Sequence, residues 1–357
     1  MMLWKDAGLQ LSCFPEVPEH VAKPWDSGDE FIFRTAPLSK ATLVINDRHG
    51  ALSCLFEDHY NLVDSACAIR AIERNRSFNT SNGRCQIVTH EDAIPADIQQ
   101  AVIKIPKNLE QLKFWLSICS QRLIEGGEIW LAGMAKHIPV AWLQWLEANS
   151  DSYEQYRIEK KARLLKLTNP VNCKTKPQGY QFQGLSLSAL PGVFSRNKLD
   201  IGSQSLLPHL EIITGGTVAD IGCGNGLLSL VIKRQCPDAQ LIACDDSMVA
   251  VRSAADNAEA NNLDIRTVHS NALDEVGDVL DWVVCNPPYH DGHKELTNIA
   301  ATMFKHSASK LKSGGRLLVV ANRHLPYEKM LRRLFPKVEI RGRDSKFNVY
   351  LCQKAAS

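Results

Sequence analysis

The chain has 357 residues, of which 45% are hydrophobic and 22% are charged, and its formal net charge is +2. This length predicts two domains, each large enough to bury its own core. Because the net charge is close to neutral, the protein surface as a whole does not attract nucleic acid, so any such affinity depends on local basic patches. No apolar run reaches the roughly 20 residues that cross a bilayer and residues 1–6 lack a signal-peptide core, so we expect a cytoplasmic protein without a membrane partner.

Eleven cysteines are scattered along the chain, with none in a Cys-x-x-Cys pair. Several of them, including Cys244, Cys285 and Cys352, fall within apolar runs that are typical of strands. A disulfide framework or a metal site would favour short, regular spacings. The pattern therefore predicts buried, reduced thiols and no metal.

Strand and helix patterns alternate through the first part of the chain. The apolar runs have the length of buried strands and lie at residues 42–45, 60–63, 101–105 and 128–131. Helical patterns lie between them at residues 65–75 and 109–123. This alternation predicts an α/β unit with a mainly parallel sheet.

Residues 153–179 form a basic junction. Their seven Lys and Arg residues face only Glu154 and Glu159, and they are Arg157, Lys160, Lys161, Arg163, Lys166, Lys174 and Lys176. Such a surplus could follow a phosphate backbone. A solvated helix that connects two domains would have the same composition, so both interpretations stay open.

A second α/β unit begins with the strand at residues 218–221. A glycine-rich loop follows at once, made of Gly222, Cys223, Gly224, Asn225 and Gly226. Glycines at such a turn permit positive φ and bring backbone N–H groups against a ligand. The next strand, at residues 240–244, ends in Asp245, where an acid is placed to bind both hydroxyls of a ribose.

The glycine loop and its acid would also suit a nicotinamide dinucleotide. Three features favour S-adenosylmethionine: the Gly-x-Gly-x-Gly spacing, Asp220 at a position where it could receive the ammonium of the amino acid, and the motif after the fourth strand. Asn271, after a third short strand, could contact the adenine edge or could be an ordinary loop residue.

The fourth strand, at residues 282–285, ends in Asn286, Pro287, Pro288 and Tyr289. The Asn side-chain oxygen and the Pro287 carbonyl can accept two hydrogen bonds from one NH2 group, while the prolines hold the loop rigid. Tyr289 could stack on the plane that carries the nitrogen. These residues are the candidate catalytic group. His290 could accept the released proton or have a structural role.

The remaining patterns complete a seven-stranded sheet with one reversed strand. They are a strand at 317–322, a helix at 327–335 and a hairpin of 338–341 with 347–351. Residues 310–346 also carry eleven Lys and Arg against three acidic residues. Some of these are expected to be ordinary solvated helix residues; the alternative is an RNA-binding surface, whose affinity would fall steeply with salt.

The two halves of the chain can be aligned. Residues 45–53 match residues 221–229 without a gap, and Pro106 falls on Pro287. This indicates an internal duplication, with chance similarity between two α/β sheets as the alternative. In the alignment, Asn46 and Arg48 replace two glycines of the loop and Ile105 replaces Asn286. The first copy, residues 1–180, is therefore expected to be degenerate and the second, residues 181–357, to be catalytic.

At this point the chain resembles the bacterial ribosomal RNA guanine-N2 methyltransferases, most closely the large-subunit enzymes of type G, with the small-subunit enzymes of type C as a sister group. The resemblance covers almost the whole chain, including residues 46–54, 193–202, 220–226, 285–290 and 321–325. It implies two tandem class I (Rossmann-like) methyltransferase domains, of which the second binds S-adenosylmethionine and the first helps to recognise RNA or to fold. Tyr289 and Asp291 depart from the Phe and Gln of these relatives.

The resemblance also implies the substrate. It predicts methyl transfer to the exocyclic N2 of a guanine in 23S ribosomal RNA, with residues 193–202 closing over the cofactor. There Phe194 would form a wall and Asp200 a polar contact; a packed entry to the domain is the alternative. The same reaction on 16S RNA, methylation of adenine N6 or protein glutamine, and a non-catalytic RNA-binding module are the other functional candidates. A monomer is compatible with the sequence.

Overall fold

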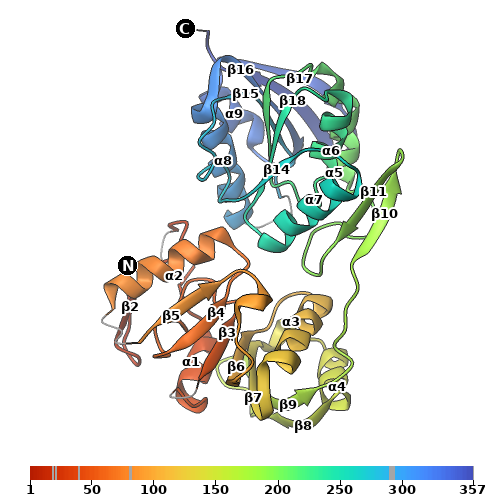
Figure 1. Ribbon diagram of the computed structural model, residues 1–357. Coiled ribbons are helices and arrows are strands. Elements are labelled where there is room, and N and C mark those ends of the chain that lie inside the picture. The colour runs from red at the N-terminus through yellow and green to blue at the C-terminus, as the bar shows by residue number, and fades with distance from the viewer. Residues whose placement is uncertain (18–19, 21, 39–40, 80–82, 289–293, 357) are drawn as a thin grey trace. The chain divides into compact units, whose positions relative to one another are not determined.

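The structure is a computed structural model that describes residues 1–17, 20, 22–38, 41–79, 83–288 and 294–356 (Figure 1). The chain forms two compact units, Met1–Lys176 and Pro177–Ser357. In the described part of the chain, no helix is both long and apolar enough to cross a membrane.

The second unit contains the predicted seven-stranded mixed sheet. Its strands lie in the order β14-β13-β12-β15-β16-β18-β17, and β18 is antiparallel to both of its neighbours (Figure 1). Their bounds are β12 (Thr217–Ile221), β13 (Gln240–Asp245), β14 (Arg266–His269), β15 (Leu280–Cys285), β16 (Leu311–Asn322), β17 (Lys337–Arg343) and β18 (Phe347–Gln353). The reversed strand predicted from the hairpin pattern is therefore confirmed.

Helices cover both faces of this sheet, which explains why its central strands are apolar on both sides. Trp282 and Val284 of β15 pack into the core on one face, and Val283 and Cys285 pack into the core on the other. The helical elements are α5 (Ile201–Leu206), η3 (Leu207–Ile212), α6 (Leu227–Gln235), α7 (Met248–Ala260), α8 (Lys294–Lys310) and α9 (Tyr327–Leu334). A hairpin of β10 (Gln178–Phe182) and β11 (Leu185–Ala189) precedes them.

The first unit repeats this architecture. Its sheet has the order β5-β4-β3-β6-β7-β9-β8, so numbering the seven strands along the chain produces the same permutation in both units. The strands are β3 (Thr42–Ile45), β4 (His59–Leu62), β5 (Cys85–Val88), β6 (Ile98–Lys104), β7 (Leu123–Met134), β8 (Ser150–Gln155) and β9 (Ala162–Pro170). The other elements are the hairpin β1 (Met2–Trp4) with β2 (Leu9–Leu11), α1 (Ser27–Thr35), α2 (Ala66–Phe78), η1 (Glu91–Ala93), α3 (Leu109–Arg122), η2 (Ala135–His137) and α4 (Val140–Ala148).

The basic junction is not a connecting helix. Residues 153–155 belong to β8 and residues 162–170 form β9, and these two strands pair antiparallel at the edge of the first sheet. Lys160 and Lys166, two of its seven basic residues, form ion pairs with Glu30 and Glu128 at 2.7 Å. The helical alternative was wrong because this segment is a strand that is buried on both faces: Ala162 and Leu164 pack into one core cluster, and Leu165 and Leu167 pack into another.

One asparagine of α7 connects the hairpin β10–β11 to the glycine loop. The Asn257 Nδ2 group donates to the carbonyls of Ser188 and Asn225, both at 2.8 Å, and Asn257 Oδ1 accepts the Ser188 N–H. One turn later, Asn261 forms the same pair of bonds with the backbone of Ser186. Side-chain amides suit this task because they donate and accept at once.

The first unit contains the same asparagine side-chain hydrogen bonds at the matching positions. Asn75 Nδ2 of α2 donates to the carbonyls of Ser12 and His49, and its Oδ1 accepts the Ser12 N–H. Asn79 bonds in the same way to the backbone of Gln10. This shared framework supports the predicted duplication, because the two units keep the polar groups that hold the fold together.

Strand register corrects one detail of the sequence alignment. In the first unit, Ile45 pairs with Ile103 of β6, while in the second unit its counterpart Ile221 pairs with Cys285 of β15. The residue at the position of Asn286 is therefore Lys104, not Ile105. The sequence alignment was one residue out because it matched Pro106 to Pro287 without knowing which residues pair across neighbouring strands. The hydrogen bonds to the neighbouring strand specify that register.

All eleven cysteines are free thiols, eight of them buried and three half-buried. The prediction of buried, reduced cysteines is borne out in its main part. Burial raises the pKa of the Cys54 thiol to about 12, so this thiol stays protonated and behaves as a small apolar side chain.

Candidate active site

Four of the predicted site residues lie at one edge of the second sheet. Asn271 follows β14, Asp245 ends β13, Asp220 lies in β12 beside the glycine loop, and Asn286 follows β15. These four strands are parallel and adjacent. Their carboxyl ends therefore meet at the same edge, where open α/β sheets bind their ligands.

The three loop glycines adopt the conformations that the sequence predicted. Gly222, Gly224 and Gly226 have φ values of 73°, 56° and 83°. A side chain on Gly226 would meet the backbone of Ala254 at 3.2 Å, so this glycine lets α6 begin against α7. A side chain on Gly224 would instead project into open space, which is the space that a ligand of this loop would occupy.

Four of the five loop N–H groups donate to protein acceptors, whereas the sequence analysis expected the loop N–H groups to face a ligand. The N–H groups of Gly222 and Cys223 donate to the Cys244 carbonyl, at 2.8 and 3.1 Å. The Gly224 N–H donates to Asp245 Oδ2 at 3.0 Å and the Gly226 N–H to the Cys223 carbonyl. The loop therefore contributes shape and close approach, because its donors stabilise its own fold.

Asp220 is fully buried and only half satisfied. Its Oδ2 accepts the N–H and the hydroxyl of Ser229, at 3.1 and 2.7 Å, whereas its buried Oδ1 has no hydrogen-bond partner in the described chain. Burial raises the pKa of this carboxyl to about 6. A buried carboxyl with one open oxygen fits a cationic ligand group, because a positive charge would favour its ionised form.

Asp245 is oriented by two backbone groups. Its Oδ2 accepts the Gly224 N–H at 3.0 Å and its Oδ1 accepts the Ser247 N–H at 2.9 Å. Each carboxylate oxygen can accept more than one hydrogen bond. The carboxylate is thus held rigidly at the tip of β13, the position that suits a pair of vicinal hydroxyls.

The other predicted cofactor residues differ in their surroundings. Asn225 is buried, and its carbonyl accepts from Asn257 while its Nδ2 donates to the Tyr180 hydroxyl at 3.4 Å. Asn271 Nδ2 donates to Asp274 at 2.9 Å. Phe194 is 59% exposed. These contacts connect the first two side chains to the protein and leave Phe194 accessible at the surface.

The two ends of the Asn286 side-chain amide have different surroundings. Its Nδ2 group donates to Asp200 Oδ2 at 2.7 Å and to the Ser203 hydroxyl at 3.0 Å. Its Oδ1 is buried and has no partner among the described residues. Pro287 is buried beside it, while Tyr289 and His290 lie outside the described residues. Asn286 thus presents a hydrogen-bond acceptor at the sheet edge.

Sequence reasoning missed several supporting residues. Ser203 and Ser229 hold the two polar groups of the site, and Tyr327 of α9 donates its hydroxyl to the Pro288 carbonyl at 3.4 Å. The repeat carried a signal for one of them, because Ser229 aligns with Ser53, which donates in the same way to Asp47. Ser203 and Tyr327 have no such local signal.

Comparison with family models matches both units. Residues 2–173 match the RLMG N-terminal domain, and residues 184–351 match the methyltransferase small domain. The two matches lie within the two compact units of the structure.

Individual proteins match over almost the whole length. The chain is 34% identical over 368 residues to the ribosomal RNA large subunit methyltransferase G of Stutzerimonas stutzeri, covering 98% of each chain. It is 33% identical to the protein of the same name from Vibrio campbellii, covering 98% of this chain and 96% of that one. A similar solved structure is the T. Thermophilus 16S rRNA N2 G1207 methyltransferase in complex with AdoMet and guanosine, with 22% identity, a TM-score of 0.76 and 92% of each chain covered.

Proposed function

The chain belongs to the ribosomal RNA large subunit methyltransferase G family, and we propose that it transfers a methyl group from S-adenosylmethionine to the exocyclic N2 amino group of a guanine in 23S ribosomal RNA. The observation that carries the proposal is the buried Oδ1 of Asn286, which has no hydrogen-bond partner in the described part of the chain and lies at the edge that also holds Asp220 and Asp245. Together with the Pro287 carbonyl, this oxygen offers two acceptors, which suits an NH2 group with two N–H donors better than a hydroxyl with one or a ring nitrogen with none.

The residues at the sheet edge fit the cofactor. Asp220 would receive the ammonium group of the amino acid and Asp245 the ribose hydroxyls, with Gly224, whose missing side chain would meet nothing within 4 Å, leaving room for close approach. Phe194 would cover the bound molecule and Asn271 would contact the base. When bound, S-adenosylmethionine supplies a methyl group on a positively charged sulfur.

Asn286 and Pro287 would orient the substrate nitrogen. Asn286 Oδ1 accepts one hydrogen of the amino group and the Pro287 carbonyl accepts the other, which directs the nitrogen lone pair toward the methyl carbon. The nitrogen–carbon bond forms as the sulfur–carbon bond breaks, and the nitrogen then loses one proton to solvent or to His290. Because the two reactants are held in line, proximity accounts for most of the acceleration. The guanine must be unstacked to reach the site.

The first unit would support folding or RNA recognition without binding the cofactor. By strand register, Val63 stands where Asp245 stands in the second unit, and Val44 stands where Asp220 stands. Neither can bind an ammonium or a hydroxyl. Titration calorimetry should therefore give one S-adenosylmethionine per chain, and two sites per chain would contradict this assignment.

Analysis of modified nucleosides tests the function. Ribosomal RNA from cells that lack this protein should acquire N2-methylguanosine in the 23S fraction when it is incubated with the protein and S-adenosylmethionine. Label in 16S RNA would show that the subunit is wrong, and N6-methyladenosine or methylated protein would show that the acceptor is wrong. Absence of transfer to any of them would overturn the proposal.

The pKa of Asp220 predicts a pH dependence of cofactor binding. This carboxyl has a pKa of about 6 in the free protein, whereas a bound ammonium would favour the ionised form, so binding below that pH must release a proton. We expect the Kd for S-adenosylmethionine to fall up to about tenfold per pH unit between pH 5 and 6 and to level off above 7. The Asp220→Asn variant, which has no such proton, should bind weakly with a flat profile in the same calorimetric titration. Equal pH dependence in both proteins would contradict the role of Asp220.

A basic surface predicts salt-dependent RNA binding. Exposed cations of α9, β17 and the following turn form this surface, and they are Lys329, Arg333, Arg341, Arg343 and Lys346. Replacing Arg341 and Arg343 by Gln should reduce the slope of log affinity against log salt by about 1 to 2. Fluorescence anisotropy with an RNA fragment measures this. Lys312→Gln is the matched control, because Lys312 already pairs with Asp281 at 2.8 Å; an equal loss of slope there would show that the effect is not local.

A further inference from the structure

We propose that Asp200 and Ser203 are positioning residues that hold the Asn286 amide in the one orientation that can receive an amino group. The inference rests on the proposed function and assigns to Asp200 a task other than contact with the cofactor. Asp200 is the N-cap of α5, and Ser203 lies three residues later in the same helix. Both side chains face Asn286, which lies 86 residues beyond Asp200 in the chain.

The chemistry of a carboxylate decides the orientation of the amide. An ionised carboxylate accepts hydrogen bonds and donates none, so the group of Asn286 that faces Asp200 must be the NH2. The oxygen is then the group left at the sheet edge, where it is buried and has no partner in the described chain. Rotating the amide by 180° would place its oxygen against the Asp200 carboxylate and present two N–H donors to the substrate amino group. Charge-assisted bonds of this kind are the strong ones, so the carboxylate excludes the flipped state.

A single oxygen joins this arrangement to the start of the helix. Asp200 Oδ2 accepts both the Asn286 Nδ2 group and the Ser203 N–H of the first helical turn, at 2.7 and 2.9 Å. The helix therefore holds the carboxylate, and the carboxylate holds the amide. A group placed in this way restricts the rotation of a catalytic side chain without touching the substrate.

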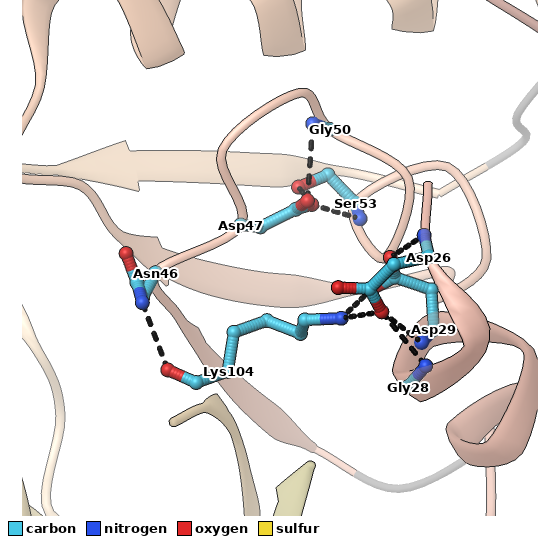
Figure 2. A network of polar contacts seen from close by, with 8 residues as sticks. All are labelled: Asp26, Gly28, Asp29, Asn46, Asp47, Gly50, Ser53 and Lys104. Carbon is cyan, nitrogen blue, oxygen red and sulfur yellow. Dashed lines mark hydrogen bonds and ion pairs between the residues drawn. The ribbon is translucent and has the colours of Figure 1, made fainter. Parts of the chain in front are cut away.

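The first unit provides an internal comparison. Asp26 caps α1 as Asp200 caps α5, Asp29 occupies the place of Ser203, and Lys104 occupies the place of Asn286. Lys104 Nζ contacts Asp26 Oδ1 at 2.5 Å and Asp29 Oδ1 at 2.8 Å, as Figure 2 shows. The same three positions thus converge in both units.

The difference between the two triads is the acceptor. An ammonium group donates hydrogen bonds and accepts none, so Lys104 presents no acceptor to a ligand. Asn286 donates to Asp200 and Ser203 in the corresponding way, and its Oδ1 remains an acceptor without a partner among the residues that the structure describes. In both units these three residues hold a helix to a strand. Among the described residues, only those of the second unit also present an oriented, unpaired oxygen.

The test replaces Asp200 by residues that keep the helix cap. Asp200→Ser retains a good N-cap, but its hydroxyl is too short to keep the bond to Asn286; Asp200→Asn retains an acceptor oxygen for both Ser203 and Asn286. In single-turnover assays at saturating S-adenosylmethionine, we expect the rate to fall about 10- to 100-fold in Asp200→Ser and to recover to within about fivefold of wild type in Asp200→Asn. The Kd for S-adenosylmethionine should stay within about twofold in both. Asp26→Ser, the same change in the first unit, should leave the rate unchanged.

A second measurement does not depend on activity. In protein labelled with 15N-asparagine, the side-chain amide signals of Asn286, assigned by their loss in Asn286→Ala, should shift in Asp200→Ser and return in Asp200→Asn. If wild type methylates no RNA, the proposed function fails while this signal still tests the orientation. An unchanged rate and an unchanged signal in Asp200→Ser overturn the inference, as does a loss confined to cofactor affinity. If Asp200→Ser does not fold, Asp200→Thr, a second capping residue, replaces it in both measurements.

Discussion

Replacing Asn286 by Ala should abolish most methyl transfer while leaving cofactor binding intact. The variant loses the buried Oδ1 that would accept the hydrogen bond of the substrate amino group. Removing one preorganised group of this kind typically reduces the turnover rate by about 10²- to 10³-fold. Transfer of labelled methyl from S-adenosylmethionine to ribosomal RNA measures the rate, and calorimetry measures the Kd of the cofactor.

Asn108→Ala is the control for this experiment. It removes an exposed helix cap of the first unit, where Asn108 accepts the Glu110 N–H at 2.8 Å. Its rate should equal that of wild type, although it loses about 1 kcal/mol of stability. A rate in Asn286→Ala within about threefold of wild type would show that proximity and cofactor alone drive the reaction, and the assignment of Asn286 would fail.

Replacing Lys104 by Met should strongly destabilise the first unit. Desolvation lowers the pKa of the Lys104 ammonium, but the charges of Asp29 and Asp26 outweigh it and hold that pKa above its ordinary value. Burial raises the pKa of Asp29 to about 7 even with the lysine present. Without the lysine, the Asp29 carboxyl, which is only 7% exposed, loses its counter-charge, whereas the Asp26 side chain is 45% exposed and stays partly solvated. We therefore expect the free energy of unfolding to fall by about 3 kcal/mol, the lower end of the cost of breaking a buried ion pair.

Denaturant unfolding followed by tryptophan fluorescence measures this loss. The matched control is Arg34→Met, which breaks an ion pair with Glu159 of similar length, 2.7 Å, in which both side chains are exposed. That change should cost at most about 1 kcal/mol. Equal losses in the two variants would mean that the Lys104 triad is not stabilising in the manner of a buried ion pair.

The fold of the second unit could be read from local patterns. Runs such as residues 218–221 and 282–285 are apolar throughout, because helices cover both faces of a parallel sheet. The loop could be recognised from its three glycines, because a turn with positive φ at three close positions favours glycine at each of them. Asp220 and Asp245 followed from their places at strand ends, and the structure brings them to one edge.

Predictions that needed a partner distant in the chain were less accurate. The junction of residues 153–179 was compatible with a helix until β9 was placed between β7 and β8. The loop N–H groups were expected to face a ligand, but the carbonyl of Cys244, from the neighbouring strand, accepts two of them. Composition alone does not reveal which strand lies beside a loop, and it is the neighbouring strand that supplies acceptors for the N–H groups of the loop.

Local sequence patterns alone were enough to predict methyltransferase chemistry and to nominate the residue types proposed for it. The Gly-x-Gly-x-Gly loop, the two acids and the Asn-Pro-Pro-Tyr motif are each local, because backbone conformation and strand ends depend on neighbours in the chain. The orientation of those groups depends on contacts that form only in the folded chain. The orientation of the Asn286 amide depends on Asp200, and the identity of Lys104 as its counterpart depends on strand register. Both are pairings between distant segments, and folding brings those partners together.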